Sequence, residues 1–405
     1  MAPRDAAPGV GDGWNADSAG PIDRIDSLDI LRGLALSGVL AINLVFEFRV
    51  SIFEQFLPPV GVESDLDRVA KRVLAVAVQS KALALFSILF GVGLAIQFER
   101  LAGNPRRPVL LVRRLAALLA IGVAHLCLVW NGDILVEYSV AGLVVLPFLF
   151  AARWVVLVGA AGFLGLYLAM PLLPPVAPLP VGAWLREHVA EATRAYGTGG
   201  ILDVLAFRLR EIPVIFPLHV EVFPRTVALF LAGILVWRSG VPRRAPDNPR
   251  LLTAVAAAGI LLGGGLTIAT DGPAPLDWPA LRRALESMAR LGAVVLAAGY
   301  AASVVGLASG SRGRKMLAWA APVGRMAFTN YIAQSLVLGW IFYGYGLGLI
   351  GRLDVAAACT IGLALYATQI AFSAWWLGRY RHGPVEWLWR TAMYGARQPM
   401  VRRAT

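Results

Sequence analysis

The chain has 405 residues, of which 58% are apolar and only 15% are charged. Because soluble proteins contain about 45–50% apolar and about 25% charged residues, this composition excludes a soluble enzyme of the same length. The net charge of +12 comes mainly from arginines at the ends of apolar runs. Basic residues in such places set membrane topology or bind anions, so we expect no nucleic-acid partner.

The predicted elements begin after a polar start. Residues 1–27 combine aspartates with glycine and proline and lack the apolar stretch of a signal peptide, so a disordered tail is predicted there. A single transmembrane domain over 28–395 and a basic tail over 396–405 follow. The ten predicted spans are 30–49, 83–98, 110–130, 134–152, 154–173, 222–237, 251–269, 289–308, 326–342 and 355–377. We therefore expect an all-α polytopic membrane protein with about ten transmembrane helices around a polar cavity.

The connections between the spans indicate how the chain is oriented. Two longer ones, 53–82 and 174–221, contain amphipathic patterns and are predicted to lie along the membrane surface or to cover a cavity. Most lysines and arginines fall on the side that also holds both termini, so both termini are predicted to be cytoplasmic. The two cysteines, Cys127 and Cys359, lie in apolar runs, so neither a disulfide framework nor a metal site is expected.

Arg114 and His125 are ionisable residues in the span over 110–130. A charged side chain inside a bilayer costs free energy, so such residues are usually retained for a function. Eleven residues make about three helical turns, so both side chains point to one face, about 16 Å apart along the axis. Arg114 lies at the cytoplasmic edge and His125 toward the outer side. This face therefore carries an arginine that can bind an anion and a histidine that is a candidate catalytic base. The alternative is that His125 is a packing histidine, hydrogen-bonded to a neighbouring carbonyl.

Asp133 is the candidate for orienting the imidazole of His125. On a continuous helix the two residues would be about 12 Å apart, so they meet only if the chain reverses direction at Gly132. Asp133 is also well placed to be the N-cap of the next helix, which is the alternative interpretation.

A second candidate set lies at the cytoplasmic entry of the first span. Asp29 and Arg32 are i, i+3 neighbours, and an intrahelical ion pair is one interpretation. In the other, Arg32 joins Arg113 and Arg114 in binding a phosphorylated ligand. Asn43 follows Arg32 by eleven residues on the same face.

Further polar residues surround the later spans. His219 and Glu221 precede the span over 222–237, and the i, i+4 spacing of Glu221 and Arg225 favours a salt bridge at the membrane rim. The candidate substrate-binding residues are Asn43, Trp130, Glu221, Arg225 and Asn330.

Several segments, spread from about residue 24 to residue 395, resemble the YeiB family of bacterial membrane proteins. The matching segments are Arg24-Ile25, 28–33, 85–93, Arg113-Arg114-Leu115, 125–135, 324–326, 329–331 and 383–390. The spans are also similar to those of heparan-alpha-glucosaminide N-acetyltransferase and of the integral-membrane acyltransferases that modify bacterial surface sugars. The resemblance implies a location in the bacterial inner membrane.

Proteins of that wider group use cytoplasmic acyl-CoA and an intramembrane histidine to acylate an acceptor on the far side. In the sugar-modifying members, an arginine and a histidine separated by ten residues form the key motif, and Arg114 and His125 have that spacing. The resemblance thus implies transfer of an acyl group, with acetyl as the expected group, from acyl-CoA to a hydroxyl or amine acceptor. Acyl-CoA would be a substrate, and no tightly bound cofactor is expected.

The alternative function is that of a secondary transporter or exporter of a small solute, because transporters also place ionisable residues within the membrane. The sequence contains no detectable inverted repeat, and Glu137 is the only acidic residue well inside a predicted span. Both observations favour the acyltransferase. The expected partners are the lipid bilayer, acyl-CoA and a sugar or small metabolite as acceptor. The sequence is compatible with both a monomer and a homo-oligomer.

Overall fold

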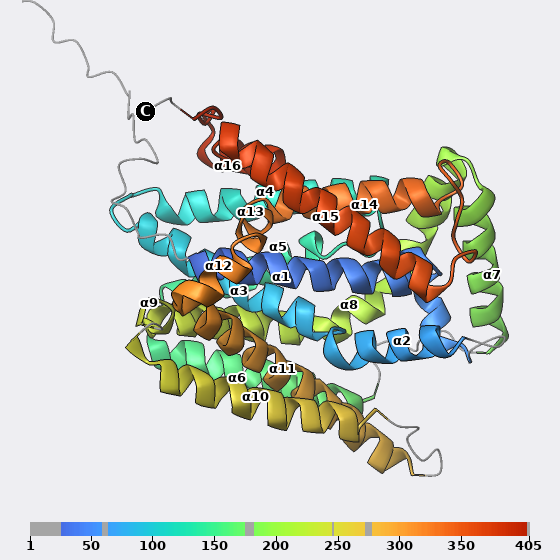
Figure 1. Cartoon of the computed structure of the whole chain (residues 1–405), viewed down its shortest axis with the longest axis horizontal. Coiled ribbons are helices and arrows are strands. Elements are labelled where there is room, and N and C mark those ends of the chain that lie inside the picture. Colours follow the sequence, from blue (N-terminus) through green and yellow to red (C-terminus); the bar gives the residue numbers. More distant parts are fainter. Residues whose placement is uncertain (1–25, 59–63, 175–181, 245–246, 272–277, 403–405) are drawn as a thin grey trace, which may run out of the picture.

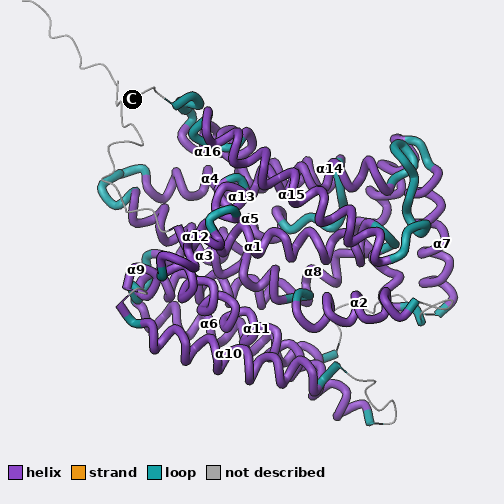
Figure 2. The backbone as a smooth tube through the Cα atoms, in the orientation of Figure 1, coloured by secondary structure: helices purple, strands orange, loops and turns teal. Residues whose placement is uncertain are grey.

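The computed structural model describes residues 26–58, 64–174, 182–244, 247–271 and 278–402. Within these ranges helices joined by loops make up the fold, and no strand is present (Figure 2). The all-α prediction is therefore confirmed. The predicted N-terminal tail lies outside the described residues, apart from Asp26 and Ser27, which begin the first helix.

The helices follow one another with few long interruptions. Their bounds are α1 Asp26–Asn43, α2 Asp65–Ala77, α3 Lys81–Arg100, α4 Arg107–Leu128, α5 Leu135–Val145, α6 Arg153–Ala169, α7 Ala183–Thr198, α8 Ile201–Arg238, α9 Val241–Arg244, α10 Pro249–Ala269, α11 Pro279–Ser309, α12 Ser311–Leu317, α13 Ala320–Arg325, α14 Ala327–Phe342, α15 Val355–Arg379 and α16 Pro384–Tyr394. A π-helix, η2 (Leu44–Phe48), continues α1, and short 3-10 helices are η3 (Ile52–Phe56), η4 (Leu146–Leu149) and η5 (Met170–Leu172).

Each of the ten predicted spans coincides with a helix. Among the described residues, eight helices are long and apolar enough to cross a bilayer. The other two predicted spans correspond to Leu135–Leu149 and to the 16 residues of α14. Both of these shorter helices begin beside the candidate site described below. The chain is thus a polytopic membrane protein.

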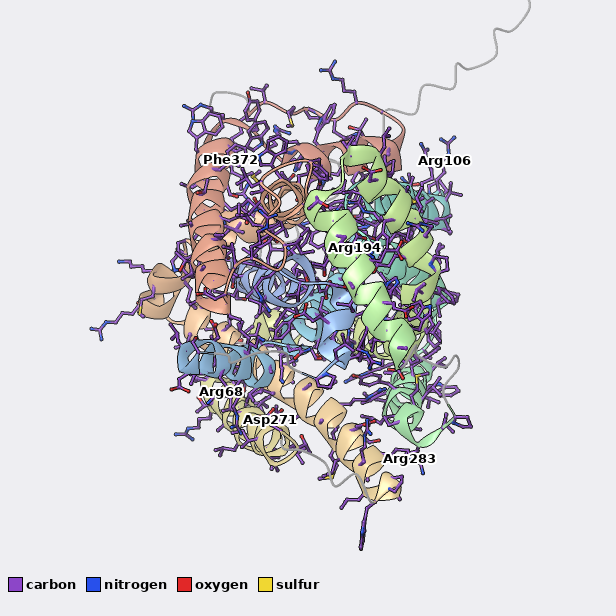
Figure 3. The ribbon with its side chains drawn as sticks, turned by 90° about the vertical axis from the view of Figure 1, so that its right-hand side faces the viewer. Arg68, Arg106, Arg194, Asp271, Arg283 and Phe372 are labelled. Atoms are coloured by element: carbon purple, nitrogen blue, oxygen red, sulfur yellow. The ribbon has the colours of Figure 1, made fainter. Side chains whose placement is uncertain are left out.

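The long helices run side by side, so the molecule has two distinct ends (Figure 1). Helix α7 covers one end, and α9, α12 and α16 lie at the opposite end. Figure 3 looks onto the α7 end, where Arg194, Arg68 and Arg283 are labelled. Helix α2, one of the predicted amphipathic segments, also belongs to the α7 end. Its apolar residues Leu66 and Val69 are exposed, as expected of a helix that lies against lipid.

Close helix contacts position the residues of the site. Gly91 on α3 and Gly233 on α8 lie where a Cβ atom would overlap backbone of the facing helix. In the same way, Gly324 on α13 packs against the carbonyl of Asp29 on α1. Small residues allow such close approach, which is how helices associate in a membrane without a hydrophobic driving force. The second contact brings the start of α1 next to the start of α14.

The described part of the basic C-terminal segment folds back onto the bundle. The backbone nitrogen of Arg381 donates to the carbonyl of Met400 (2.8 Å), and Trp387 Nε1 donates to the carbonyl of Gln398 (2.7 Å). Residues 396–402 therefore pack against the segment that leads into α16.

Candidate functional site

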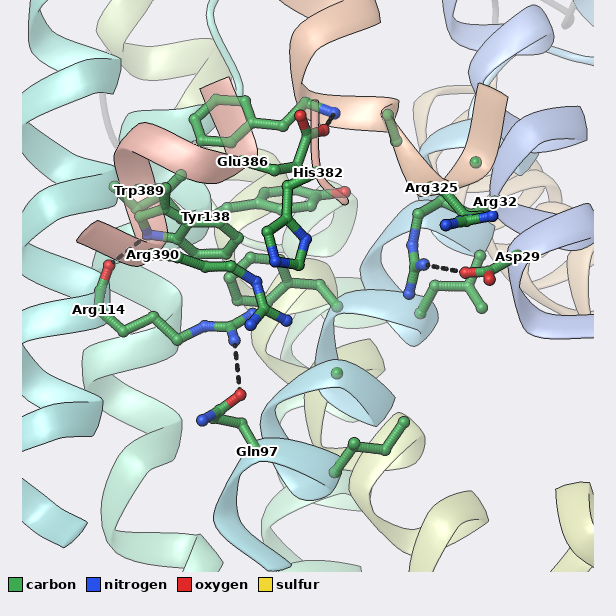
Figure 4. A pocket seen from close by; sticks show the side chains of 18 of the residues that line it. Asp29, Arg32, Gln97, Arg114, Tyr138, Arg325, His382, Glu386, Trp389 and Arg390 are labelled. Atoms are coloured by element: carbon green, nitrogen blue, oxygen red, sulfur yellow. Dashed lines mark hydrogen bonds and ion pairs between the residues drawn. The ribbon is translucent and has the colours of Figure 1, made fainter. Parts of the chain in front are cut away.

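A cavity of about 470 Å³ opens at the end of the bundle that carries α16. Its walls come from α1, α3, α4, α5, α14 and α16. Figure 4 shows that polar side chains from separate helices converge on it. The charged and polar lining residues include Asp29, Arg32, Gln97, Arg100, Arg114, Arg325, Arg381, His382, Glu386 and Arg390. Six arginines against two carboxylates make the cavity strongly cationic, so an anionic ligand is favoured there.

Two of the predicted arginines, Arg32 and Arg114, line this cavity. Arg32 Nη1 donates to Asp29 Oδ1 (3.0 Å), so the intrahelical pair forms and still leaves the arginine in the cavity wall. Arg114 Nη1 lies 3.5 Å from Gln97 Oε1, and its guanidinium stacks over the ring of Trp389 at 4.2 Å. The buried Nε of Arg114 has no hydrogen-bond partner among the described residues. The guanidinium of Arg114 is therefore fixed in orientation by Trp389, and its Nε–H can still donate a hydrogen bond to a ligand.

Glu386 attaches helix α16 to the start of α14, beside the cavity. Its carboxylate accepts hydrogen bonds from the backbone nitrogens of Phe328 (2.8 Å) and Thr329 (3.1 Å) and from the Thr329 hydroxyl. These are the first amides of α14, which have no partner within their own helix. Burial raises the pKa of Glu386, and the hydrogen bonds from Thr329 and Phe328 act in the opposite direction. The contact explains structurally why Glu386 and Thr329 occur in the two late motifs.

The inner part of the cavity is aromatic and apolar, with Phe86, Phe90, Tyr138 and Tyr331 among its lining residues. Tyr331 also contacts the ring of His125, with 5.3 Å between ring centroids. The backbone nitrogen of Ile134 donates to the Tyr331 hydroxyl (3.3 Å). The cavity thus leads from the arginines to an aromatic wall, and His125 lies against that wall without lining the cavity itself.

His125 and Asp133 meet, because the chain reverses direction at Gly132. His125 Nδ1 lies 2.8 Å from Asp133 Oδ1, and both side chains are almost fully buried. The second oxygen, Oδ2, accepts from the backbone nitrogen of Val136 (2.8 Å), so Asp133 is at once the orienting carboxylate and the cap of α5. The buried Nε2 of His125 has no hydrogen-bond partner among the described residues. In the tautomer with its proton on Nδ1, a neutral histidine in this position has an unshared lone pair on Nε2.

Close packing and a hydrogen bond stabilise the chain reversal at Gly132. Gly122 allows the start of α5 to approach α4, and Gly132 fits between the Trp130 ring and the Glu47 carboxylate, where a Cβ atom would overlap both. Asn131 Nδ2 donates to Glu211 Oε2 (2.6 Å) on α8. The His125–Asp133 pair is therefore part of a rigid element, as preorganised chemistry requires.

A second histidine–carboxylate pair lies one turn further along α5. His219 Nδ1 on α8 is 3.1 Å from Glu137 Oε2, and the Thr226 hydroxyl donates to the other oxygen of Glu137. Glu47 belongs to the π-helix η2, and it is close enough to act electrostatically on His219. Glu137 and His219 are 82 positions apart, so no local sequence pattern pairs them.

The remaining predicted residues lie elsewhere. Arg113 Nη2 donates to the carbonyl of Ala392 (3.2 Å) and does not line the cavity. Asn43 is buried at the junction of α1 and η2. Trp130 stacks on Phe48 and stands edge-on to His125. Asn330 joins α14 to α15 by donating to Ser373 Oγ (2.9 Å). Only Trp130 of these four contacts the histidine.

The predicted rim salt bridge between Glu221 and Arg225 is wrong. Glu221 Oε2 instead pairs with Arg290 Nη2 on α11 (3.3 Å). Arg225 is buried, with its guanidinium carbon 5.8 Å from the centre of the Tyr167 ring. The i, i+4 pattern identified a neighbour on the same helix, but α11 supplies a cation on a facing helix, which no local pattern reveals.

Fold and site together define the class: an all-α membrane protein with a cationic cavity at one end and a buried histidine–aspartate pair behind it. Comparison with known proteins supplies the family. Residues 236–396 match the family described as "Protein of unknown function (DUF418)". Three relatives align over nearly their whole length. YxaH of Bacillus subtilis (strain 168) is 33% identical over 94% of this chain and 97% of its own.

YeiB of Escherichia coli (strain K12) is 29% identical over 95% of this chain and 100% of its own. A 39.9 kDa protein from the amylase 3′ region of Bacillus acidopullulyticus is 27% identical over 94% of this chain and 96% of its own. All three relatives are named as uncharacterized proteins. The chain belongs to the YeiB family, as the sequence motifs predicted.

Proposed function

We propose that the protein is an integral-membrane acyltransferase that moves an acyl group, acetyl in the simplest case, from cytoplasmic acyl-CoA to a hydroxyl or amine acceptor on the outer side. The observation that carries the proposal is the continuity of the site: six arginines at the open end, an aromatic inner wall, and the His125–Asp133 pair behind Tyr331. In this proposal the anionic donor binds at the arginines, and His125 acts from behind the aromatic wall.

The arginines are suited to the phosphates of CoA. Guanidinium groups form charge-assisted, bidentate hydrogen bonds with phosphate oxygens. Arg114 and His125 lie on one face of α4, about 16 Å apart at 1.5 Å per residue. The extended pantetheine arm would follow the inner wall across that distance and bring the thioester to Tyr331, whose side chain would have to move for the thioester to reach His125.

The chemistry proposed for His125 uses its Nε2 atom. With the Nδ1 proton held by Asp133, Nε2 carries the lone pair that takes the acceptor's proton or attacks the thioester carbonyl. In either case the C–S bond of acetyl-CoA breaks, the acceptor gains the acetyl group, and CoA leaves as the thiol with the acceptor's proton.

The orientation proposed for the chain places the cationic cavity in the cytoplasm and α7 outside, in the inner membrane of a bacterial cell. It follows from the excess of basic residues on the side of both termini. Helix α8 is longer than the membrane is thick: its 38 residues extend about 57 Å, against a hydrocarbon core of about 30 Å. Its N-terminal half therefore projects from the membrane together with α7.

Single-cysteine labelling tests this orientation. A cysteine at Thr198 should react with an impermeant maleimide in intact cells, whereas a cysteine at Ser311 should react only after the cells are opened. Both positions lie at helix ends, so neither substitution disturbs a span. The opposite pattern would place the arginines outside and remove the donor site.

Donor binding is tested by calorimetry with acetyl-CoA and purified protein. Arg114→Gln and Arg32→Gln should each weaken binding tenfold or more, because a hydrogen bond to a charged group contributes about 1.5–3 kcal/mol. Arg113→Gln is the matched control, since Arg113 is adjacent on α4 but points to the carbonyl of Ala392. Its affinity should stay that of the parent. Equal affinities in all four proteins, or no binding by the parent, would favour the transporter.

A further inference from the structure

The His219–Glu137 pair repeats the arrangement of the His125–Asp133 pair. In both, a carboxylate at the start of α5 holds the Nδ1 atom of a histidine from another helix. Asp133 and Glu137 are four positions apart, which is about one helical turn, or 6 Å along the axis. Since each carboxylate is bound to its histidine, the two pairs are neighbours at the start of α5.

The two histidines differ in exposure. The His125 side chain is 2% exposed, whereas that of His219 is 30% exposed. Nδ1 of His219 contacts Glu137, so its Nε2 is the ring nitrogen not engaged by that carboxylate. His219 also lies where α8 leaves the membrane in the proposed orientation, between the prolines at positions 217 and 224, which interrupt the helix hydrogen bonds.

We propose that the two pairs divide the reaction: His125 takes the acyl group, and His219 takes the proton of the acceptor. This inference rests on the proposed acyltransferase function.

In the first step, Nε2 of His125 attacks the thioester carbonyl, the N–C bond forms, the C–S bond breaks, and the thiolate leaves. In the second, the acceptor oxygen or nitrogen attacks the same carbonyl while its proton passes to Nε2 of His219. The N–C bond then breaks, and its electron pair returns to His125. His219 releases the proton, which balances the thiolate formed earlier.

The division can be tested with two acceptors in the full-length protein. Water needs a base to attack an acyl-imidazole, whereas hydroxylamine is a strong neutral nucleophile near pH 7 and needs none. CoA release from acetyl-CoA should therefore respond differently to His219→Gln with each acceptor. We expect hydrolysis to fall about a hundred- to ten-thousandfold, the usual range for loss of a general base, and hydroxylaminolysis to stay within a few-fold of the parent.

Two further variants complete the test. Hydroxylamine also cleaves thioesters directly, so each rate is taken above that of the same mixture without protein. His125→Gln should lower both protein-dependent reactions equally, because both need the acyl-imidazole. Glu191→Gln is the control: Glu191 on α7 pairs with Arg210 (3.2 Å), and both side chains are exposed. It should lower neither reaction. A His219→Gln protein that loses both reactions equally, or neither, would overturn the division while leaving the acyltransferase intact. No CoA release by the parent with either acceptor would instead remove the proposed function, and the division with it.

Discussion

His125→Ala is expected to abolish acyl transfer while leaving acetyl-CoA binding nearly unchanged. The imidazole lies behind Tyr331 and does not line the cavity, so its removal takes away no donor contact. What is lost is the buried Nε2 atom, and loss of a positioned base typically costs about a hundred- to ten-thousandfold in rate. The measurement is transfer or hydrolysis of radiolabelled acetyl-CoA, normalised to monodisperse protein, alongside calorimetric binding.

Imidazole added in solution is a useful control for this variant. Because alanine leaves a space of the size of the missing ring, free imidazole should restore part of the activity of His125→Ala and should not stimulate the parent. A packing histidine predicts a different result, namely a less stable protein with near-normal turnover per folded molecule. Parent-like rates in His125→Ala would show that the catalytic role is wrong.

The helices and one face of the site were predictable because they depend on local regularities. Apolar runs of bilayer length located ten helices, and the eleven-residue spacing placed Arg114 and His125 along one face. The meeting of His125 with Asp133 depended on one conditional step, a reversal at Gly132, which the sequence allowed but did not require. The structure shows that the reversal occurs and that Gly132 is the residue that fits it.

The parts that could not be predicted depend on contacts between distant segments. Arg381 and Arg390 have the composition of an interfacial anchor, and only the attachment of Glu386 to the start of α14 brings their segment over the cavity. Likewise, Glu137 and His219 form a pair because α5 packs against α8. Neither periodicity nor motif spacing encodes such contacts. The prediction from sequence therefore included too few arginines in the cavity and did not include the His219–Glu137 pair.

Asp133→Asn is expected to lower turnover more than Asp133→Ala, although asparagine preserves more of the structure. The backbone nitrogen of Val136 donates to Oδ2 of Asp133, so an asparagine would turn its carbonyl oxygen toward Val136 and its NH₂ group toward His125. That NH₂ group donates to Nδ1 and so forces the imidazole proton onto Nε2. The reactive lone pair is then lost, and a fall of at least about a hundredfold follows.

Alanine separates this tautomer effect from simple destabilisation. Asp133→Ala removes the cap of α5, which costs about 1 kcal/mol of folding stability, but it leaves the histidine free to adopt either tautomer. Stability should therefore rank the parent and Asp133→Asn above Asp133→Ala, whereas turnover should rank the parent first, alanine second and asparagine last. Thermal unfolding and acetyl-CoA hydrolysis measured on the same preparations check both orders. If turnover follows stability instead, Asp133 serves only as a helix cap, and the state of His125 is set by another group.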